Sequence, residues 1–227
     1  MKNVILTILL IIASNVTFSK SLNFAVQKDT AQFDKNSNYH QQIGLYEVYK
    51  DKQYDIVMLG NSITQGVNWM ELLGRTNIAN RGISSDILEG FTARIEYIYK
   101  LNPKYVFIMG GINDIYNRYP IQDIFKNYTY LISLLKTRNI NVVVQSTLYV
   151  NPKWKYAEER NKEVENLNNL LESYCKNNNI EFIDLNKKLS KNKVLNIDYT
   201  YDGLHLNGKG YKIWGEEVEK MLKKFGY

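Results

Sequence analysis

A serine that could act as a nucleophile follows a short apolar run. Residues 54–59 read Tyr-Asp-Ile-Val-Met-Leu, a run that is too short for a helix and is bounded by turn residues, so it predicts a buried strand. Gly60 and Asn61 end this run, and Ser62 comes next. In an open α/β sheet, ligands bind beyond the carboxyl ends of the strands, where Ser62 would present its hydroxyl. Gly-Asn-Ser is also ordinary turn chemistry, so a plain turn is the alternative at this point.

Asp202 and His205 could supply the acid and the base that a serine nucleophile needs. A serine hydroxyl reacts poorly near neutral pH without an adjacent base, and histidine most often takes that role. A carboxylate that accepts the other ring N–H fixes the tautomer and stabilises the imidazolium. Asp202 and His205 lie three residues apart in an Asp-Gly-Leu-His segment, so one turn could deliver both. A turn-capping aspartate and a solvated histidine would give the same pattern.

Gly82 and Asn113 could donate hydrogen bonds to a developing oxyanion. Ester hydrolysis builds negative charge on the carbonyl oxygen, and preorganised N–H donors aimed at that oxygen are usually the largest catalytic contribution. Glycine lets a backbone N–H approach a ligand without interference from Cβ. Asn113 offers an uncharged amide, and Ser62 adds its own N–H. Each also has a structural interpretation, Gly82 as a turn glycine and Asn113 as a helix cap.

The candidate residues fall between alternating strands and helices. Short apolar or β-branched runs predict strands at residues 54–59, 77–80, 105–109, 141–145 and 180–185. Apolar residues at helical spacing predict helices at residues 39–49, 69–73, 87–101, 121–135, 157–176 and 208–224. We expect Ser84 or Ser85 to cap the third of these helices. The alternation implies βαβ units and a parallel sheet, and therefore one three-layer α/β/α domain.

Four short blocks, taken in order, resemble those of the SGNH hydrolases, the GDSL-type esterases. The blocks are Gly60-Asn61-Ser62-Ile63-Thr64, Asn80-Arg81-Gly82-Ile83-Ser84, Gly110-Gly111-Ile112-Asn113-Asp114 and Asp202-Gly203-Leu204-His205-Leu206. The resemblance extends over roughly residues 54–214. One residue departs from the family pattern, which has Asp before the serine where this chain has Asn61. In this respect the chain is similar to the secreted acetylesterase and platelet-activating-factor-acetylhydrolase-like branches.

The resemblance implies a fold, a set of roles and a reaction. The implied fold is flavodoxin-like, with a five-stranded parallel sheet in the order 2-1-3-4-5. Ser62 would be the nucleophile, His205 the base and Asp202 its orienting acid, and the oxyanion hole would consist of Ser62, Gly82 and Asn113. The resemblance implies no metal and no organic cofactor. The expected activity is that of a serine esterase that hydrolyses small acyl esters through an acyl-Ser62 intermediate, with O-acetyl groups on carbohydrate as the expected substrate.

Two other functions fit the same blocks. A lipid esterase (a lysophospholipase) or a thioesterase would use the same triad on a more apolar substrate. A non-catalytic carbohydrate-binding module would keep the fold without turnover. Trp69 and Trp154 could line a sugar-binding cleft, although core packing would explain them equally well.

Composition narrows the range of partners. The chain has 227 residues, 44% of them hydrophobic, which suits one globular domain with a sizeable core. The net charge is +6, but no Lys/Arg block forms a nucleic-acid patch, so we expect no nucleic-acid partner. Cys175 is the only cysteine, so an internal disulfide is excluded. The expected partner is a small-molecule or glycan acyl ester, and the sequence does not indicate an oligomeric state.

Residues 1–20 have the layout of a secretory signal peptide. A short positive start is followed by an apolar run at residues 4–13 and then by small and polar residues. The apolar run is short for a membrane span, although an uncleaved anchor is the alternative. We therefore expect an exported protein (periplasmic, cell-surface or secreted) without stable membrane insertion after cleavage. Residues 21–227 would then form the hydrolase domain.

Overall fold

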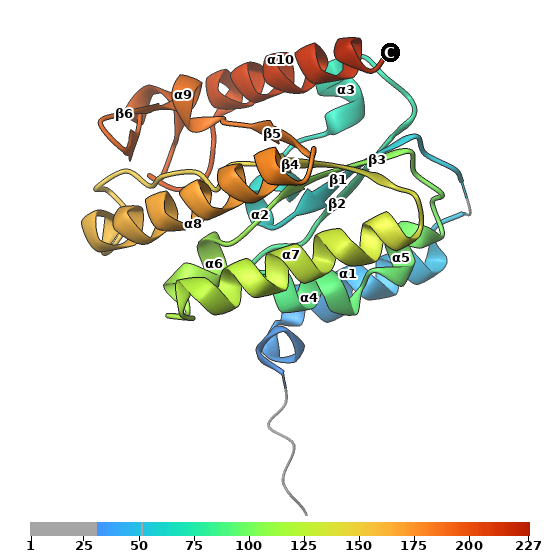
Figure 1. Cartoon of the computed structure of the whole chain (residues 1–227), viewed down its shortest axis with the longest axis horizontal. Coiled ribbons are helices and arrows are strands. Elements are labelled where there is room, and N and C mark those ends of the chain that lie inside the picture. The colour runs from blue at the N-terminus through green and yellow to red at the C-terminus, as the bar shows by residue number, and fades with distance from the viewer. Residues whose placement is uncertain (1–30, 51) are drawn as a thin grey trace, which may run out of the picture. The chain divides into compact units, whose positions relative to one another are not determined.

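A parallel sheet of five strands forms the centre of the structure (Figure 1). The computed structural model describes residues 31–50 and 52–227, so the predicted signal peptide lies outside the described residues. The strand order is β2-β1-β3-β4-β5, and every neighbouring pair is parallel, which confirms the expected order 2-1-3-4-5. The strands are β1 (Ile56–Gly60), β2 (Ile78–Gly82), β3 (Tyr105–Met109), β4 (Asn141–Gln145) and β5 (Glu181–Ile183).

Helices cover both faces of the sheet and complete the three-layer α/β/α fold. Figure 1 shows α3 (Trp69–Leu73) and α10 (Gly208–Lys224) over one face. The other face carries α4 (Leu88–Ala93), α5 (Glu96–Tyr99), α7 (Ile121–Thr137) and α8 (Ala157–Asn177). The remaining elements are η1 (Gln32–Lys35), α1 (Ser37–Val48), α2 (Ser62–Gln65), α6 (Ile112–Tyr116), α9 (Asn186–Leu189), the β6–β7 hairpin (Ser190–Lys191 and Val194–Leu195) and η2 (Ile197–Tyr199).

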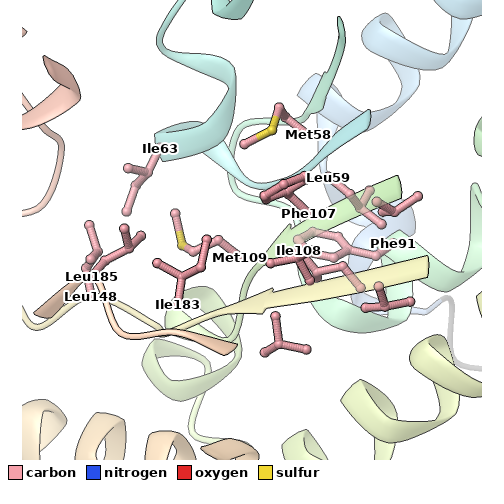
Figure 2. Close-up of a cluster of buried hydrophobic side chains, with 14 of the residues drawn as sticks. Met58, Leu59, Ile63, Phe91, Phe107, Ile108, Met109, Leu148, Ile183 and Leu185 are labelled. Atoms are coloured by element: carbon pink, nitrogen blue, oxygen red, sulfur yellow. The ribbon is translucent and has the colours of Figure 1, made fainter. Parts of the chain in front are cut away.

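The central strands are apolar along their length because both of their faces are buried. All five residues of β1 are buried, and the apolar residues of β3 from Val106 to Met109 have no exposed surface. Figure 2 shows Met58 and Leu59 of β1 in one cluster with Phe107 of β3 and Phe91 of α4. This packing explains why the sequence shows continuous apolar runs at these strands instead of alternation.

The expected helix at residues 87–101 is two short helices, α4 and α5, so the single-helix prediction is wrong. Neither Ser84 nor Ser85 caps α4, because the N-cap position is Ile87, which makes no side-chain cap hydrogen bond. The Leu88 N–H of the first turn instead donates to Asp114 Oδ1 from α6, at 3.2 Å. A residue 26 positions away therefore does the work of a local cap, which sequence spacing does not reveal.

A buried arginine joins the carboxyl ends of β1 and β2. Arg94 has no exposed surface, and its Nε donates to Asp86 Oδ2 at 2.8 Å. Its two terminal nitrogens donate to the carbonyl oxygens of Arg81, at 2.9 Å, and of Gly60, at 3.0 Å. One side chain therefore connects both strand ends to the loop that follows β2.

Arg94→Met is expected to lower the free energy of unfolding by about 3–5 kcal/mol, because it leaves the Asp86 carboxylate buried without a charged partner. Urea denaturation measures the loss. Arg75→Met is the matched control, since Arg75 pairs with Glu219 at a partly exposed site, and it is expected to cost about 1 kcal/mol or less. Equal losses in the two variants would contradict the importance given to the buried pair.

Asp114 is a second buried acid at this edge of the sheet. Its Oδ2 has no hydrogen-bond partner among the described residues, and burial raises its pKa to about 7. A carboxyl whose pKa is higher in the folded than in the unfolded state stabilises the fold at low pH. The stabilisation is lost as the pH rises from about 4 through about 7.

Asp114→Asn is expected to raise stability relative to wild type at pH 8 and to have little effect near pH 4. The asparagine keeps an oxygen for the Leu88 N–H and cannot ionise. Denaturation curves at the two pH values measure the difference. A stability difference of the same size at both pH values would mean that ionisation of Asp114 does not control it.

Candidate active site

Ser62, His205 and Asp202 form a continuous chain of hydrogen-bonding groups. Ser62 Oγ lies 3.0 Å from His205 Nε2, and His205 Nδ1 lies 2.6 Å from Asp202 Oδ2. All three side chains are half-buried. The structure thus brings together the three residues for which the sequence predicted nucleophile, base and acid. A serine, a histidine and a carboxylate in this arrangement can carry out nucleophilic acyl transfer.

The loop between η2 and α10 holds the acid and the base together. Asp202 Oδ1 accepts the backbone N–H groups of Leu204, at 2.9 Å, and His205, at 2.8 Å. Thr200 Oγ1 closes the turn by donating to the His205 carbonyl at 2.6 Å and accepting the Gly203 N–H at 2.9 Å. Gly203 has a φ of 103°, a conformation that favours glycine.

Asp202 is held in its ionised form. Burial raises the pKa of this carboxyl, but the hydrogen bond to the His205 ring and the two backbone N–H bonds outweigh burial, so the net pKa lies below its ordinary value. An ionised Asp202 accepts the Nδ1–H of His205 and leaves Nε2 free to accept a proton from Ser62.

Asn61 fixes the start of α2 and therefore the position of Ser62. The side chain of Asn61 is fully buried, and its Oδ1 accepts the Ile63 N–H at 3.0 Å as the N-cap of α2. Ser62 is the first residue of this helix, directly after β1. The asparagine that departs from the family pattern therefore caps the helix that begins with Ser62, and the carboxylate that contacts the His205 ring is that of Asp202.

The amide of Asn113 is oriented by the loop that follows β2. Its Nδ2 donates to the Asp86 carbonyl at 2.8 Å. A side-chain amide nitrogen carries two hydrogens, so the second N–H remains to donate to a ligand. Asn113 lies in α6, after β3, and Ser62 lies in α2, after β1, and these two strands are direct neighbours. The two residues therefore lie at the same edge of the sheet.

Gly82 does not occupy the position that the sequence predicted for it. It is the last residue of β2, and its N–H donates to Asn80 Oδ1 at 2.8 Å. The backbone of Gln65 lies so close to Gly82 that a Cβ at this position would overlap it. The glycine is therefore required for packing of α2 against β2, and its N–H is already paired within the fold.

Ser85 offers a backbone N–H in the loop where Gly82 was expected to do so. It is exposed and has a φ of 61°, a left-handed conformation that is uncommon for a residue other than glycine. Within the described part of the chain, its N–H has no hydrogen-bond acceptor. Sequence reasoning missed Ser85 because a serine carries no signal of a positive φ.

A hollow of about 280 Å³ lies beside Ser85 and Asn113. Residues 32, 33, 35 and 36 of the N-terminal segment line its other wall. Asn36 anchors this wall by donating from its side chain to the Ser84 carbonyl at 2.8 Å. The sequence shows no clear period in this segment, so its contact with the loop that carries Ser85 was not predicted.

The other candidates from the sequence lie elsewhere in the fold. Trp69 is buried, donates to the Thr64 carbonyl at 2.9 Å and packs edge-on against Trp214, so it belongs to the core. Trp154 is half-buried and contacts His205. Cys175 is buried in α8, where burial raises the pKa of its thiol to about 12, so it is not a nucleophile near neutral pH.

Two features are absent from the described residues, 31–50 and 52–227. No three His, Cys, Asp or Glu side chains gather there in a way that would hold a metal ion. The described helices also include none with the length and apolar character that a membrane span requires.

Solved structures share this fold. A GDSL-like lipase from Bacteroides thetaiotaomicron VPI-5482 superimposes with a TM-score of 0.72 and 27% identity, over 82% of this chain and 98% of the lipase. An acetylxylan esterase from Geobacillus stearothermophilus superimposes with a TM-score of 0.60 and 16% identity, over 75% of this chain and 93% of the esterase.

Curated relatives are longer proteins. An N-acylneuraminate cytidylyltransferase from Escherichia coli O18:K1:H7 (strain RS218 / NMEC) is 26% identical over 225 residues, which cover 93% of this chain and 51% of the relative. Matches to the N-acylneuraminate cytidylyltransferases of Streptococcus agalactiae cover 29% of those proteins. The chain thus spans about half or less of the length of the curated relatives that it matches.

The four blocks of the sequence, the sheet order and the Ser62–His205–Asp202 arrangement agree with one family. The GDSL-like lipase/acylhydrolase family matches residues 58–213, which is well over half of the chain. The chain therefore belongs to the GDSL-like lipase/acylhydrolase family, the SGNH hydrolases.

Proposed function

We propose that this hydrolase is a serine esterase that removes small acyl groups, acetyl above all, from carbohydrate. The observation that carries the proposal is the unbroken path from Ser62 Oγ through the His205 ring to Asp202, with separations of 3.0 and 2.6 Å. Such a path activates a serine hydroxyl for attack on a carbonyl carbon.

In the first half of the reaction, Ser62 is acylated. A lone pair on Ser62 Oγ forms a bond to the ester carbonyl carbon, the carbonyl π electrons move to oxygen, and the hydroxyl proton passes to His205 Nε2. The bond from carbon to the alcohol oxygen then breaks, and Nε2 returns the proton to that oxygen. In the second half, water repeats the sequence on acyl-Ser62 and releases the acid.

Three N–H groups are assigned to the oxyanion. They are the backbone N–H of Ser62, the second amide N–H of Asn113 and the backbone N–H of Ser85, which takes the place first expected for Gly82. The support for Ser85 is its position after β2, next to Asn113 along the same hollow. Donors fixed before the reaction stabilise the developing charge without reorganisation.

Similar proteins support the acyl and sugar parts of the proposal. An acetylxylan esterase, which by its name removes acetyl groups from a polysaccharide, shares the fold. Export of the protein is also a proposal, and it rests on the signal-peptide pattern of residues 1–20.

Ser62→Ala is expected to abolish hydrolysis of p-nitrophenyl acetate, because the variant lacks the attacking oxygen. Release of p-nitrophenolate by purified protein measures the reaction. Ser190→Ala, which changes a serine outside the site, is the control and should turn over like the wild type. Undiminished turnover by Ser62→Ala would overturn the assignment.

A series of p-nitrophenyl esters of increasing acyl length tests the lipid-esterase alternative, for which activity should rise with chain length.

Asn113→Ala is expected to lower kcat by about 10²–10³, by analogy with the loss of one oxyanion-hole donor. The effect should appear in kcat more than in KM, because the oxyanion exists only after attack has begun. Steady-state kinetics on p-nitrophenyl acetate measures it. Asn117→Ala, one helical turn further along the same wall of the hollow, is the control for general disturbance. Similar losses in the two variants would argue against a specific role for Asn113.

A further inference from the structure

The side chains around His205 lie where the alcohol half of an ester would leave Ser62 in the proposed reaction. In the proposed reaction, on which this inference rests, Nε2 gives its proton to the departing alcohol oxygen, so that alcohol must lie against His205. The acyl group instead stays on Ser62. Groups that contact the imidazole from the solvent side are therefore in position to recognise the alcohol half of the ester.

Two aromatic rings flank the imidazole. The Tyr201 ring stacks on it with a centroid separation of 5.9 Å and an interplanar angle of 14°. The Trp154 ring meets it edge-on, at 6.1 Å and 89°. Tyr201 is 65% exposed, so its ring does not belong to the core. Part of the ring is therefore open to solvent next to the imidazole.

Trp154 is held in this position by its own loop. The Asn151 N–H donates to the Gly203 carbonyl at 2.7 Å, and the Trp154 N–H donates to the Asn151 carbonyl at 2.8 Å. A Cβ on Gly203 would lie 3.0 Å from Lys153 Cβ and 3.1 Å from the Trp154 nitrogen, so the two backbones are in close contact. The loop that carries Trp154 is therefore fixed to the loop that carries the base.

There is room for a ligand next to Trp154. A hollow of about 700 Å³ borders Trp154 and is also lined by Lys153, Lys155, Tyr156, Glu158 and Glu159 among others. This volume is within the range of small-molecule sites. Its lining combines aromatic rings with lysines and carboxylates.

We propose that Trp154 and Tyr201 form a subsite that binds the sugar ring of the leaving alcohol. A pyranose has apolar C–H faces and a rim of hydroxyl groups. Its faces can pack against rings that are flat and apolar, while its hydroxyl groups stay near water, the Tyr201 hydroxyl and the lysines. An acyclic alcohol lacks the faces and gains little from either ring. The subsite therefore selects esters by the shape of the alcohol.

The test varies the alcohol and keeps the acyl group constant. Acetate release from methyl 6-O-acetyl-glucopyranoside and from ethyl acetate is followed by pH-stat, and the ratio of the two kcat/KM values is the readout. Tyr201→Ala and Trp154→Ala are each expected to lower this ratio about tenfold, mainly through KM for the sugar ester. Tyr201→Phe, which keeps the ring, should restore most of it. Tyr130→Ala, at an exposed tyrosine of α7, is the control and should leave the ratio at its wild-type value.

A binding measurement separates this inference from the proposed function. Calorimetric titration of Ser62→Ala with the sugar ester should show binding, and adding Tyr201→Ala should weaken it about tenfold. If the wild type hydrolyses neither ester, the proposed function fails, and the titration still tests the subsite. The inference is overturned if the ratio and the affinity are unchanged in the alanine variants. It is also overturned if both esters lose activity equally, since the rings would then only position His205.

Discussion

The contact on which the site most depends is the one between the Arg94 guanidinium and three oxygen atoms at the carboxyl edge of the sheet. Two of these oxygens belong to the backbone of Gly60 and Arg81, at the ends of adjacent strands, and the third belongs to Asp86. The Asp86 carbonyl in turn accepts the amide of Asn113. The strand end that presents Ser62, the loop with Ser85 and the Asn113 amide are therefore linked to a single cation that has no exposed surface.

The sheet order explains why this edge is available. β1 lies between β2 and β3, and the chain leaves β1 toward β2 but returns on the far side to form β3. The loops that follow β1 and β3 therefore diverge and leave a crevice between them, as in other open α/β sheets. The base and the acid enter this crevice from a loop 140 or more positions along the chain, without any strand of their own. The acid and the base thus come from a loop separate from those that carry Ser62 and Asn113.

The features that follow local chemical rules were predictable from the sequence. Buried strands show as apolar runs. The Asp-Gly-Leu-His segment brings Asp202 and His205 together because they are only three positions apart and the glycine between them allows a tight turn. Gly82 and Ser85 show the limit of this reasoning. Gly82 looked like a donor because it is a glycine, but tertiary packing against Gln65 accounts for it. Ser85 looked like a cap, but the surrounding fold holds it at a positive φ. The break between α4 and α5 and the wall at residues 32–36 also depend on partners distant in sequence.

Helix α1 bears on where the boundary of the folded domain lies in this chain. Tyr39, Tyr46 and Ile83 form a small hydrophobic cluster separate from the main core, and the Tyr46 ring also lies 4.5 Å from the Arg81 guanidinium. The loop after β2 thus completes its packing with residues that lie upstream of the segment 58–213 that carries the family likeness. A domain boundary placed at residue 58, where the family match begins, would separate Tyr39 and Tyr46 from Ile83. The segment that matches the family is therefore shorter than the segment that packs as one folded domain. A chimaera made between two relatives should exchange the longer segment, with α1 included.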